Sequence, residues 1–225
     1  SMVECSAKIL DCAEEDATEE LRVSFQPSSW FANAFCEYYI QESAGEKYNI
    51  ISAPAEEIIR RIIANQDQLG FAYFEDSQLD KLKKMFPENH IGYYTLKRTK
   101  TVLYCRDKAY HEKRNEISLV QGVEDYYSGI SLWKEQKENE EEKRKLQVKV
   151  TTNSDYIMQA MLQKTDLGNI SPDGLSHSDK FINHDTMQLE KQEQSVQFIC
   201  IFRNDQKMEK LPKKFLTFIK KYVME

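Results

Sequence analysis

Apolar and polar positions change their spacing at one point near the start of the chain. Residues 21–26 (LRVSFQ) are apolar at every second position, which predicts a β-strand with one buried face. Pro27 cannot donate to a sheet ladder and ends this strand. Apolar residues then recur at helical spacing over 30–39, and Ser28 and Ser29 stand where a helix N-cap is expected. The pattern therefore predicts a strand, a short polar turn and a helix.

Strand and helix patterns continue to alternate along most of the chain. Residues 69–74 (LGFAYF) are continuously apolar, which is typical of a central strand covered on both faces. Residues 117–123 fit either one helical turn or a short strand, and residues 134–145 form a charge run typical of a solvated surface. The other predicted strands span 48–52, 90–96, 101–105, 129–133, 146–150, 168–172 and 196–202. The other predicted helices span 55–66, 77–86, 155–164 and 208–223. The third of these helices is expected to bury Ile157, Ala160 and Met161.

This alternation predicts the fold class. Strands separated by helices favour mostly parallel sheets with right-handed crossovers, and 225 residues suffice for two lobes of about 100 residues each. We therefore expect an α/β protein with two Rossmann-like lobes, each holding a mostly parallel sheet, joined by two crossover strands. Lobe I is expected to comprise residues 21–104 and 191–225, and lobe II residues 105–190. Residues 1–20 are expected to be a tether or the end of an upstream helix.

Composition and charge exclude several function classes. The net charge of −6 and the pI near 5.4 argue against nucleic-acid binding by this segment itself, because phosphate contacts need a basic surface. No apolar run approaches the roughly 20 residues of a membrane span, and the N-terminal residues do not resemble a secretory signal, so a cytoplasmic location is expected. The five cysteines and four histidines show no metal-ligand spacing. Reduced thiols and no metal or other cofactor are expected.

The polar turns that follow two strands are the candidate sites. Ser28 and Ser29 lie between the first strand and its helix, and Thr152 and Asn153 repeat this arrangement after the strand over 146–150. A strand-to-helix turn presents free backbone N–H groups and hydroxyls where the helix dipole favours an anion. The alternative is that the hydroxyls only cap their helices. No nucleophile, acid/base set or phosphate loop accompanies them, so an enzyme is the least favoured class.

The order of these motifs resembles that of a known family. The opening LRVSFQPSSWFANAF, the helix-strand unit AEEIIRRIIANQDQLGFAYF, the stretch ISLVQGVEDYYSGISL, the segment VKVTTNSDYIMQAMLQKTDLGNISP and the closing VQFICIF with its helix carry the resemblance. From Leu21 to Val223 the chain is similar to the effector-binding domain of LysR-type transcriptional regulators, which has the type 2 periplasmic-binding-protein fold. The glycine pair common in the second lobe of that family is reduced to Gly168.

The resemblance implies a function and a site. It implies a small, anionic effector bound between the lobes, touched by both polar turns and by the segment around Thr99 to Thr101. It also implies a homodimer or tetramer, and DNA binding only through an N-terminal winged helix-turn-helix that these residues do not include. The implied ligand-binding residues are Ser28, Ser29, Trp30, Thr99, Thr101, Thr152 and Asn153. A solute-binding protein of the same fold is the alternative, and the lack of a secretory signal counts against it.

Overall fold

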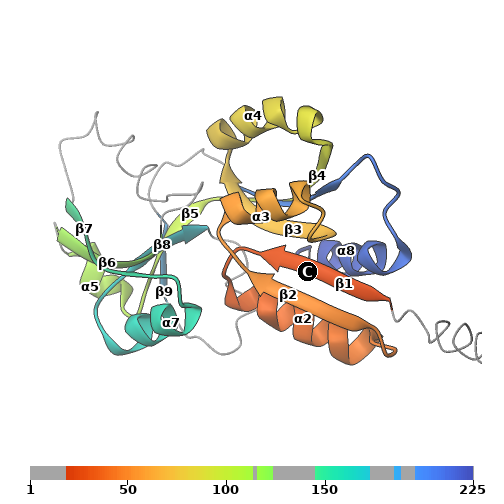
Figure 1. Ribbon diagram of the computed structural model, residues 1–225. Coiled ribbons are helices and arrows are strands. Elements are labelled where there is room, and N and C mark those ends of the chain that lie inside the picture. Colours follow the sequence, from red (N-terminus) through yellow and green to blue (C-terminus); the bar gives the residue numbers. More distant parts are fainter. Residues whose placement is uncertain (1–18, 114–115, 124–144, 173–184, 189–195, 225) are drawn as a thin grey trace, which may run out of the picture.

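The structure is a computed structural model that describes residues 19–113, 116–123, 145–172, 185–188 and 196–224 (Figure 1). Most of the predicted N-terminal tether, the predicted strand over 129–133 and nearly all of the charge run over 134–145 lie outside these residues. Among the helices that are described, none is long and apolar enough to cross a membrane.

The first sheet has five strands in the order β2-β1-β3-β10-β4. Strand β1 (Glu20–Phe25) pairs in parallel with β2 (Lys47–Ser52) and with β3 (Leu69–Glu75). Strand β10 (Val196–Arg203) is inserted antiparallel between β3 and β4 (Ile91–Thr99). Four of the five strands thus run the same way, as the mostly parallel prediction requires, and the reversed direction of β10 was not predicted.

Helices cover both faces of this sheet (Figure 1). Helices α2 (Ser29–Glu42) and α8 (Lys210–Tyr222) share one apolar cluster with β1, β3 and β10. Helices α3 (Ala55–Ile63) and α4 (Asp76–Met85) share a second cluster with the opposite face of β3 and β10. The continuously apolar β3 is buried at every residue, because it lies between these two helical layers. The prediction of a central strand is confirmed.

Strand β1 is buried more completely than its alternating pattern predicted. Leu21 and Val23 are buried as expected, but the polar Ser24 is also fully buried. The reason is that β1 lies inside the sheet, with α8 against one face and α3 against the other. The prediction of a single buried face was wrong for this strand.

The second part of the molecule begins with β5 (Thr101–Cys105), which leaves the first sheet (Figure 1). Strand β5 pairs antiparallel with β8 (Asn169–Pro172) and with β9 (Asp185–Gln188). Strand β6 (Glu116–Gly122) pairs in parallel with β7 (Lys145–Thr152). The pairings of this lobe are therefore mixed, and 117–123 forms a strand rather than a helical turn. Strand β9 was not predicted, because its residues show no strand pattern.

Two short helices accompany these strands. Helix α5 (Lys108–Glu112) was not predicted, and Asp107 caps it by accepting from the Tyr110 N–H at 3.2 Å. Helix α7 (Asp155–Lys164) has the predicted bounds, but the expected burial of Ile157 was wrong, since its side chain is 46% exposed. The buried residue of α7 is Leu162. A weakly amphipathic helix has no single apolar stripe, so its sequence does not determine which side faces the sheet.

Candidate functional site

The carboxyl ends of the first-lobe strands lie at one edge of their sheet. Thr99, the last residue of β4, pairs with Val196, the first residue of β10. Val196 also pairs with Glu75, the last residue of β3. Ser28 follows the end of β1, which runs parallel to β3. The structure therefore places the predicted site residues Ser28 and Thr99 along the same edge.

The predicted residues of the second lobe also share an edge. Thr101 begins β5 and pairs with Pro172, the last residue of β8. Thr152 ends β7 and pairs with Gly122, the last residue of β6. An isolated parallel bridge joins β6 to the residue before β8. The carboxyl ends of β6, β7 and β8 thus lie together with the start of β5.

The two edges adjoin where the chain crosses between the sheets. Only the exposed Lys100 separates Thr99 from Thr101, and both threonines are buried, at 9% and 2% exposed. Ligands of open α/β sheets bind outside the carboxyl ends of the strands. The two adjoining edges are therefore the candidate site.

Ser28 has an uncommitted hydroxyl at this edge. It occupies the N-cap position of α2 with extended backbone angles (φ −162°, ψ 131°), but its side chain makes no capping hydrogen bond. Only its carbonyl is used locally, accepting from the Ala32 N–H at 3.4 Å. The first N–H groups of a helix have no partner within the helix. The turn after β1 therefore offers both a hydroxyl and backbone donors, whereas the side chain of Ser29 is not described.

The turn after β7 uses its hydroxyls differently. The Thr152 hydroxyl accepts from the Ser154 N–H at 3.0 Å, and the Ser154 hydroxyl accepts from the Ile157 N–H at 3.3 Å. Asn153 between them is exposed. These hydroxyls order the start of α7, as the capping alternative proposed, and each keeps one O–H to donate. The two turns are thus similar in sequence but differ in their hydrogen bonds: the Thr152 and Ser154 hydroxyls accept from backbone N–H groups, whereas the Ser28 hydroxyl makes no capping bond.

Trp30 lies in the core instead of lining the edge. Its side chain is 6% exposed, and its ring packs edge-on against Phe198 with centroids 5.0 Å apart. Its indole N–H donates to the Tyr73 hydroxyl at 3.0 Å. Burial raises the pKa of Tyr73 well above its ordinary value, so this phenol remains protonated. Trp30 therefore holds the Tyr73 hydroxyl from within the core.

Two glutamines at the strand ends were missed by the sequence analysis. The Gln26 carbonyl oxygen Oε1 accepts from the Tyr73 backbone N–H at 2.9 Å. In the second lobe, Gln121 Oε1 accepts from the Ile170 N–H at 3.1 Å, and its Nε2 donates to the Ile170 carbonyl at 3.3 Å. A glutamine at the end of a strand-like segment is the only sequence signal for either residue.

Another glutamine ties β10 to its neighbours at the same edge. Gln197 is 3% exposed and accepts from the Thr95 hydroxyl at 2.8 Å. Its amide nitrogen donates to Asp76 at the start of α4, and Asp76 also forms an ion pair with Arg98 at 3.6 Å. The opposite charges of Asp76 and Arg98 near this edge thus partly neutralise each other. Within the described ranges, no group of three or more His, Cys, Asp or Glu side chains could hold a metal ion.

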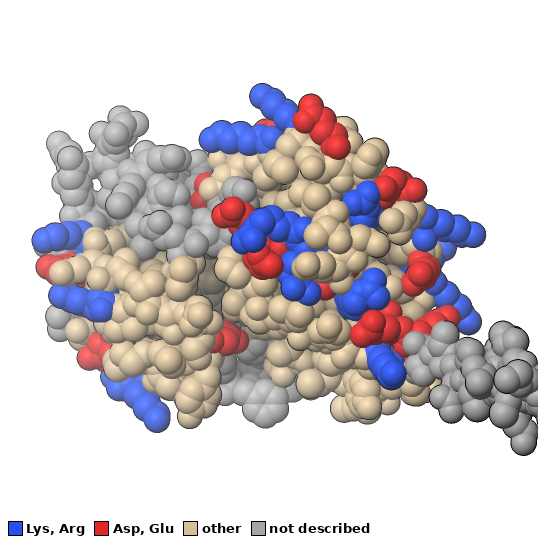
Figure 2. All heavy atoms as spheres, viewed as in Figure 1, with Lys and Arg blue, Asp and Glu red and all other residues tan. Residues whose placement is uncertain are grey.

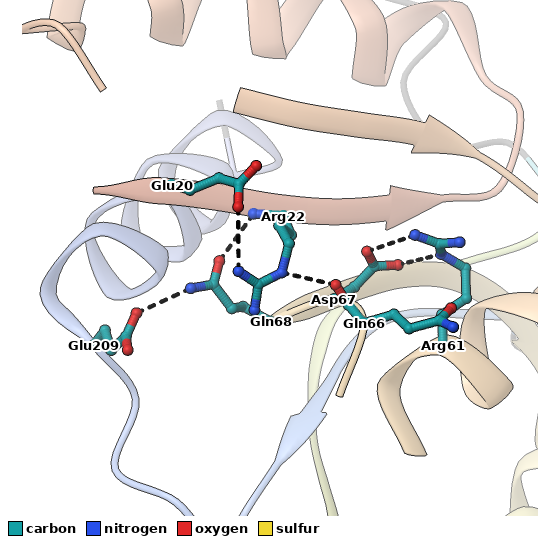
Figure 3. Close-up of polar contacts among 7 residues, drawn as sticks. All are labelled: Glu20, Arg22, Arg61, Gln66, Asp67, Gln68 and Glu209. Atoms are coloured by element: carbon teal, nitrogen blue, oxygen red, sulfur yellow. Dashed lines mark hydrogen bonds and ion pairs between the residues drawn. The ribbon is translucent and has the colours of Figure 1, made fainter. Parts of the chain in front are cut away.

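A separate polar network lies at the opposite, amino-terminal edge of the first sheet (Figure 3). Arg61 donates to both carboxylate oxygens of Asp67, at 2.6 and 2.9 Å. These hydrogen bonds raise the pKa of Arg61. Arg22 donates to the Gln66 carbonyl at 2.8 Å, next to the turn that leads into β3. This network fastens the turn between α3 and β3 and is remote from the strand ends that form the candidate site.

One face of the molecule carries interspersed charges. On the face drawn in Figure 2, lysine and arginine side chains lie among aspartates and glutamates and form no continuous basic area. Such a face agrees with the net charge of −6 and does not suit a phosphate backbone.

No protein-family model matches the sequence, and no curated protein matches it at a significant level. The structure does match solved structures over nearly its whole length. The regulatory domain of MexT, a transcriptional activator in Pseudomonas aeruginosa, superposes with a TM-score of 0.66 at 12% identity, covering 91% of this chain and 100% of that one. HinK, a LysR family transcriptional regulator from the same organism, gives 0.63 at 11% identity, covering 99% of this chain and 76% of HinK.

The effector-binding domain of BenM, solved with its effector benzoate, gives a TM-score of 0.62 at 9% identity, covering 92% of this chain and 93% of that one. At such low identities the similarity concerns the fold. The chain therefore has the fold of the effector-binding domains of LysR-type transcription regulators, which is the type 2 periplasmic-binding-protein fold.

Proposed function

We propose that this chain is the effector-binding domain of a LysR-type transcription regulator and that it binds a small anionic metabolite between its lobes. The observation that carries the proposal is the adjoining pair of polar strand ends, which holds Ser28 and Thr99 on one side and Thr101 and Thr152 on the other. The benzoate in the BenM effector-binding domain is a carboxylate on the same fold.

The groups available in the first-lobe turn favour an acceptor-rich ligand. The Ser28 hydroxyl and the first N–H groups of α2 are donors, and the positive end of the helix dipole lies there. A carboxylate at this point would gain charge-assisted hydrogen bonds. The Thr152 hydroxyl, which still has its proton to donate, would contact the ligand from lobe II.

Binding would act through the arrangement of the lobes. A ligand that contacts both edges favours the arrangement in which both contacts form, and it shifts the population by its difference in affinity for the two arrangements. With β5 (Thr101–Cys105) in lobe II, the chain first crosses between the lobes at Lys100, and it is back in lobe I at β10 (Val196–Arg203). The shift would be passed to an N-terminal winged helix-turn-helix, which alone contacts DNA.

The functional unit is a homodimer in this proposal. Tyr39 and Ile40 on α2 are 51% and 81% exposed, and Tyr156 and Ile157 on α7 are 81% and 46% exposed. Exposed large apolar side chains on two helices suit burial against a second copy of the chain. Sedimentation should show a dimer for the unaltered chain and a weaker dimer for Ile40→Glu. A monomer at high concentration would contradict this part of the proposal.

Thermal-shift measurements with benzoate, succinate and citrate test the ligand class. A ligand at about 100 times its dissociation constant stabilises the fold by about 2.7 kcal/mol. Ser28→Ala should weaken binding of the responding carboxylate by about fivefold, since one hydrogen bond contributes about 1 kcal/mol. Thr217→Ala, which removes an exposed hydroxyl on α8, should leave binding unchanged. The absence of any shift with all three carboxylates would refute the proposed ligand class.

A further inference from the structure

We infer that Gln26 is a ligand-recognition residue, whose side-chain amide presents a fixed N–H donor to an acceptor oxygen of the ligand bound between the lobes. This inference rests on the proposed function and names the group that selects the ligand there. A residue at the end of β1 is suited to this task because its strand leads directly into the Ser28 turn.

The Gln26 side chain takes the place of its own backbone carbonyl in the sheet. The Gln26 N–H donates to the Phe71 carbonyl at 2.9 Å, as in a regular parallel ladder. The next ladder bond would join the Tyr73 N–H to the backbone carbonyl of Gln26, but it goes to Gln26 Oε1 instead, at 2.9 Å. Pro27 follows immediately and cannot donate to the ladder. The amide is therefore held in place by a backbone group of β3.

The second lobe contains the same substitution at the corresponding place. Its β6–β8 ladder forms at Gly168, where the Gly168 N–H donates to the Ser118 carbonyl at 3.0 Å. Further along, Gln121 Oε1 and Nε2 bond to the N–H and carbonyl of Ile170, in positions that the main chain of β6 would otherwise supply. Asn169 donates to the Val120 carbonyl at 2.9 Å. In both lobes a glutamine amide thus completes the sheet at the strand ends.

Gln26 lies where the connections of the first sheet diverge. In the order β2-β1-β3, the chain leaves β1 toward α2 on one face and leaves β3 toward α4 on the other. Such a switch point is where open α/β sheets bind their ligands. Gln26 therefore stands at the switch point of the first sheet, at the edge that adjoins the crossover to β5.

The two amides differ in what they leave available. An N–H donor must face the amide oxygen, so the bond from Tyr73 assigns Oε1 and leaves Nε2 on the other branch. Nε2 of Gln26 bonds to no residue of the described ranges, and the side chain is half-buried, so it remains accessible. Nε2 of Gln121 bonds to the Ile170 carbonyl. Gln26 thus presents a donor, whereas Gln121 is a positioning residue for β8.

The donor character of the Gln26 amide gives the selectivity. Gln26 Nε2 and the Ser28 hydroxyl, two residues along, can both donate. The carboxylates at this edge belong to Glu75 and Asp76, and Asp76 is already bonded to Gln197 and paired with Arg98. An oxygen acceptor such as a ligand carboxylate satisfies both donors, whereas an ammonium group would face further donors. The ligand is therefore selected as an oxyanion or an oxygen-rich acid at this end.

Gln26→Glu tests this role with little change in shape. The new carboxylate still accepts from the Tyr73 N–H, but it replaces the donor with a negatively charged acceptor. Binding of benzoate, succinate or citrate, whichever stabilises the unaltered chain, should weaken by at least about tenfold. Gln121→Glu is the matched control: losing the bond to the Ile170 carbonyl should lower the melting temperature without the ligand, and the affinity should fall by less than about threefold.

A measurement on the unaltered chain makes the test independent of the folding of the variant. In a ¹⁵N-labelled sample, the side-chain NH₂ signals of Gln26 should shift on titration with the responding carboxylate, and those of Gln121 should shift less. Unchanged Gln26 signals at saturation, or full affinity in Gln26→Glu, would overturn this inference and leave the proposed function standing. No response of the unaltered chain to any of the three carboxylates would overturn both.

Discussion

Replacing Gly70 by alanine tests how α3 is packed against the central strand. Gly70 lies in β3, where a Cβ atom would stand 2.4 Å from Ile58 Cγ2 and 3.0 Å from Ile201 Cγ1. The first of these side chains belongs to α3 and the second to β10, and both are fully buried. Carbon atoms in contact normally lie about 3.5–4.0 Å apart. The helix can therefore approach the sheet this closely only because residue 70 has no side chain.

The expected cost follows from these distances. Inserting a methyl group into a packed core costs typically about 1–3 kcal/mol, and the lost freedom of the unfolded chain on replacing glycine returns about 0.4–1 kcal/mol. Because the closest approach is only 2.4 Å, the cost lies in the upper part of its range, and Gly70→Ala should lower the free energy of unfolding by about 1–2.5 kcal/mol. In a chain of this size each kcal/mol corresponds to about 2–4 °C in melting temperature.

Gly122→Ala is the matched control for this change. A Cβ at Gly122, the last residue of β6, would meet no heavy atom within 4 Å, so the substitution should be neutral or slightly stabilising. Urea denaturation monitored by circular dichroism measures both variants against the unaltered chain. The packing argument is refuted if Gly70→Ala is as stable as the unaltered chain, or if Gly122→Ala loses as much stability.

Two further substitutions test single interactions. Tyr38→Phe should stabilise the protein by about 0.5–1 kcal/mol, because the buried Tyr38 hydroxyl has no hydrogen-bond partner in the described part of the chain. Burial raises the pKa of Tyr38 above its ordinary 10.0, so above that pH the unfolded chain loses the proton first and stability falls. Tyr38→Phe should reduce this fall by about 1.4 kcal/mol per pH unit, measured by urea unfolding. Asp67→Ala should cost about 3 kcal/mol, because its fully buried carboxylate pairs with Arg61, whereas Asp80→Ala should change stability by less than about 0.5 kcal/mol, because its ion pair with Lys83 is exposed.

Above pH 10 the free energy of unfolding should decrease more steeply with pH in the unaltered chain than in Tyr38→Phe. Equal slopes would contradict the account of that tyrosine. Equal losses in Asp67→Ala and Asp80→Ala would contradict the account of the buried ion pair. Both outcomes are decided by the same urea series, with Asp80→Ala as the surface control.

The sequence predicted where the candidate site residues lie in the fold, but not which hydrogen bonds their side chains make. Ser28 and Thr152 could be placed at strand ends because the change from alternating to helical spacing is visible in consecutive residues. That the Thr152 hydroxyl orders the start of α7, whereas the Ser28 hydroxyl makes no capping bond, could not be predicted. Serine and threonine are both common in polar turns and at helix N-caps, and only the local backbone geometry decides which hydrogen bond each hydroxyl makes.

Gln26 shows why the remaining part was missed. In the sequence it is the polar member of an alternating pair, which predicts a solvated side chain. Its partner Tyr73 is 47 residues away, and a hydrogen bond over that separation exists only once β1 and β3 are paired. Trp30 was predicted on the apolar stripe of its helix, but the aromatic rings that enclose it could not be named from the sequence, because they come from β10 and α8.

The sequence by itself determined the strands and helices of the first lobe, their order and the two polar turns, because each depends on spacing among near neighbours. Tertiary structure alone decided the antiparallel direction of β10, the burial of Ser24 on the second face of β1 and the orientation of α7. It also decided which donors at the strand ends stay free. These properties depend on which distant segment lies alongside, and a pattern of neighbouring residues carries no information about that segment.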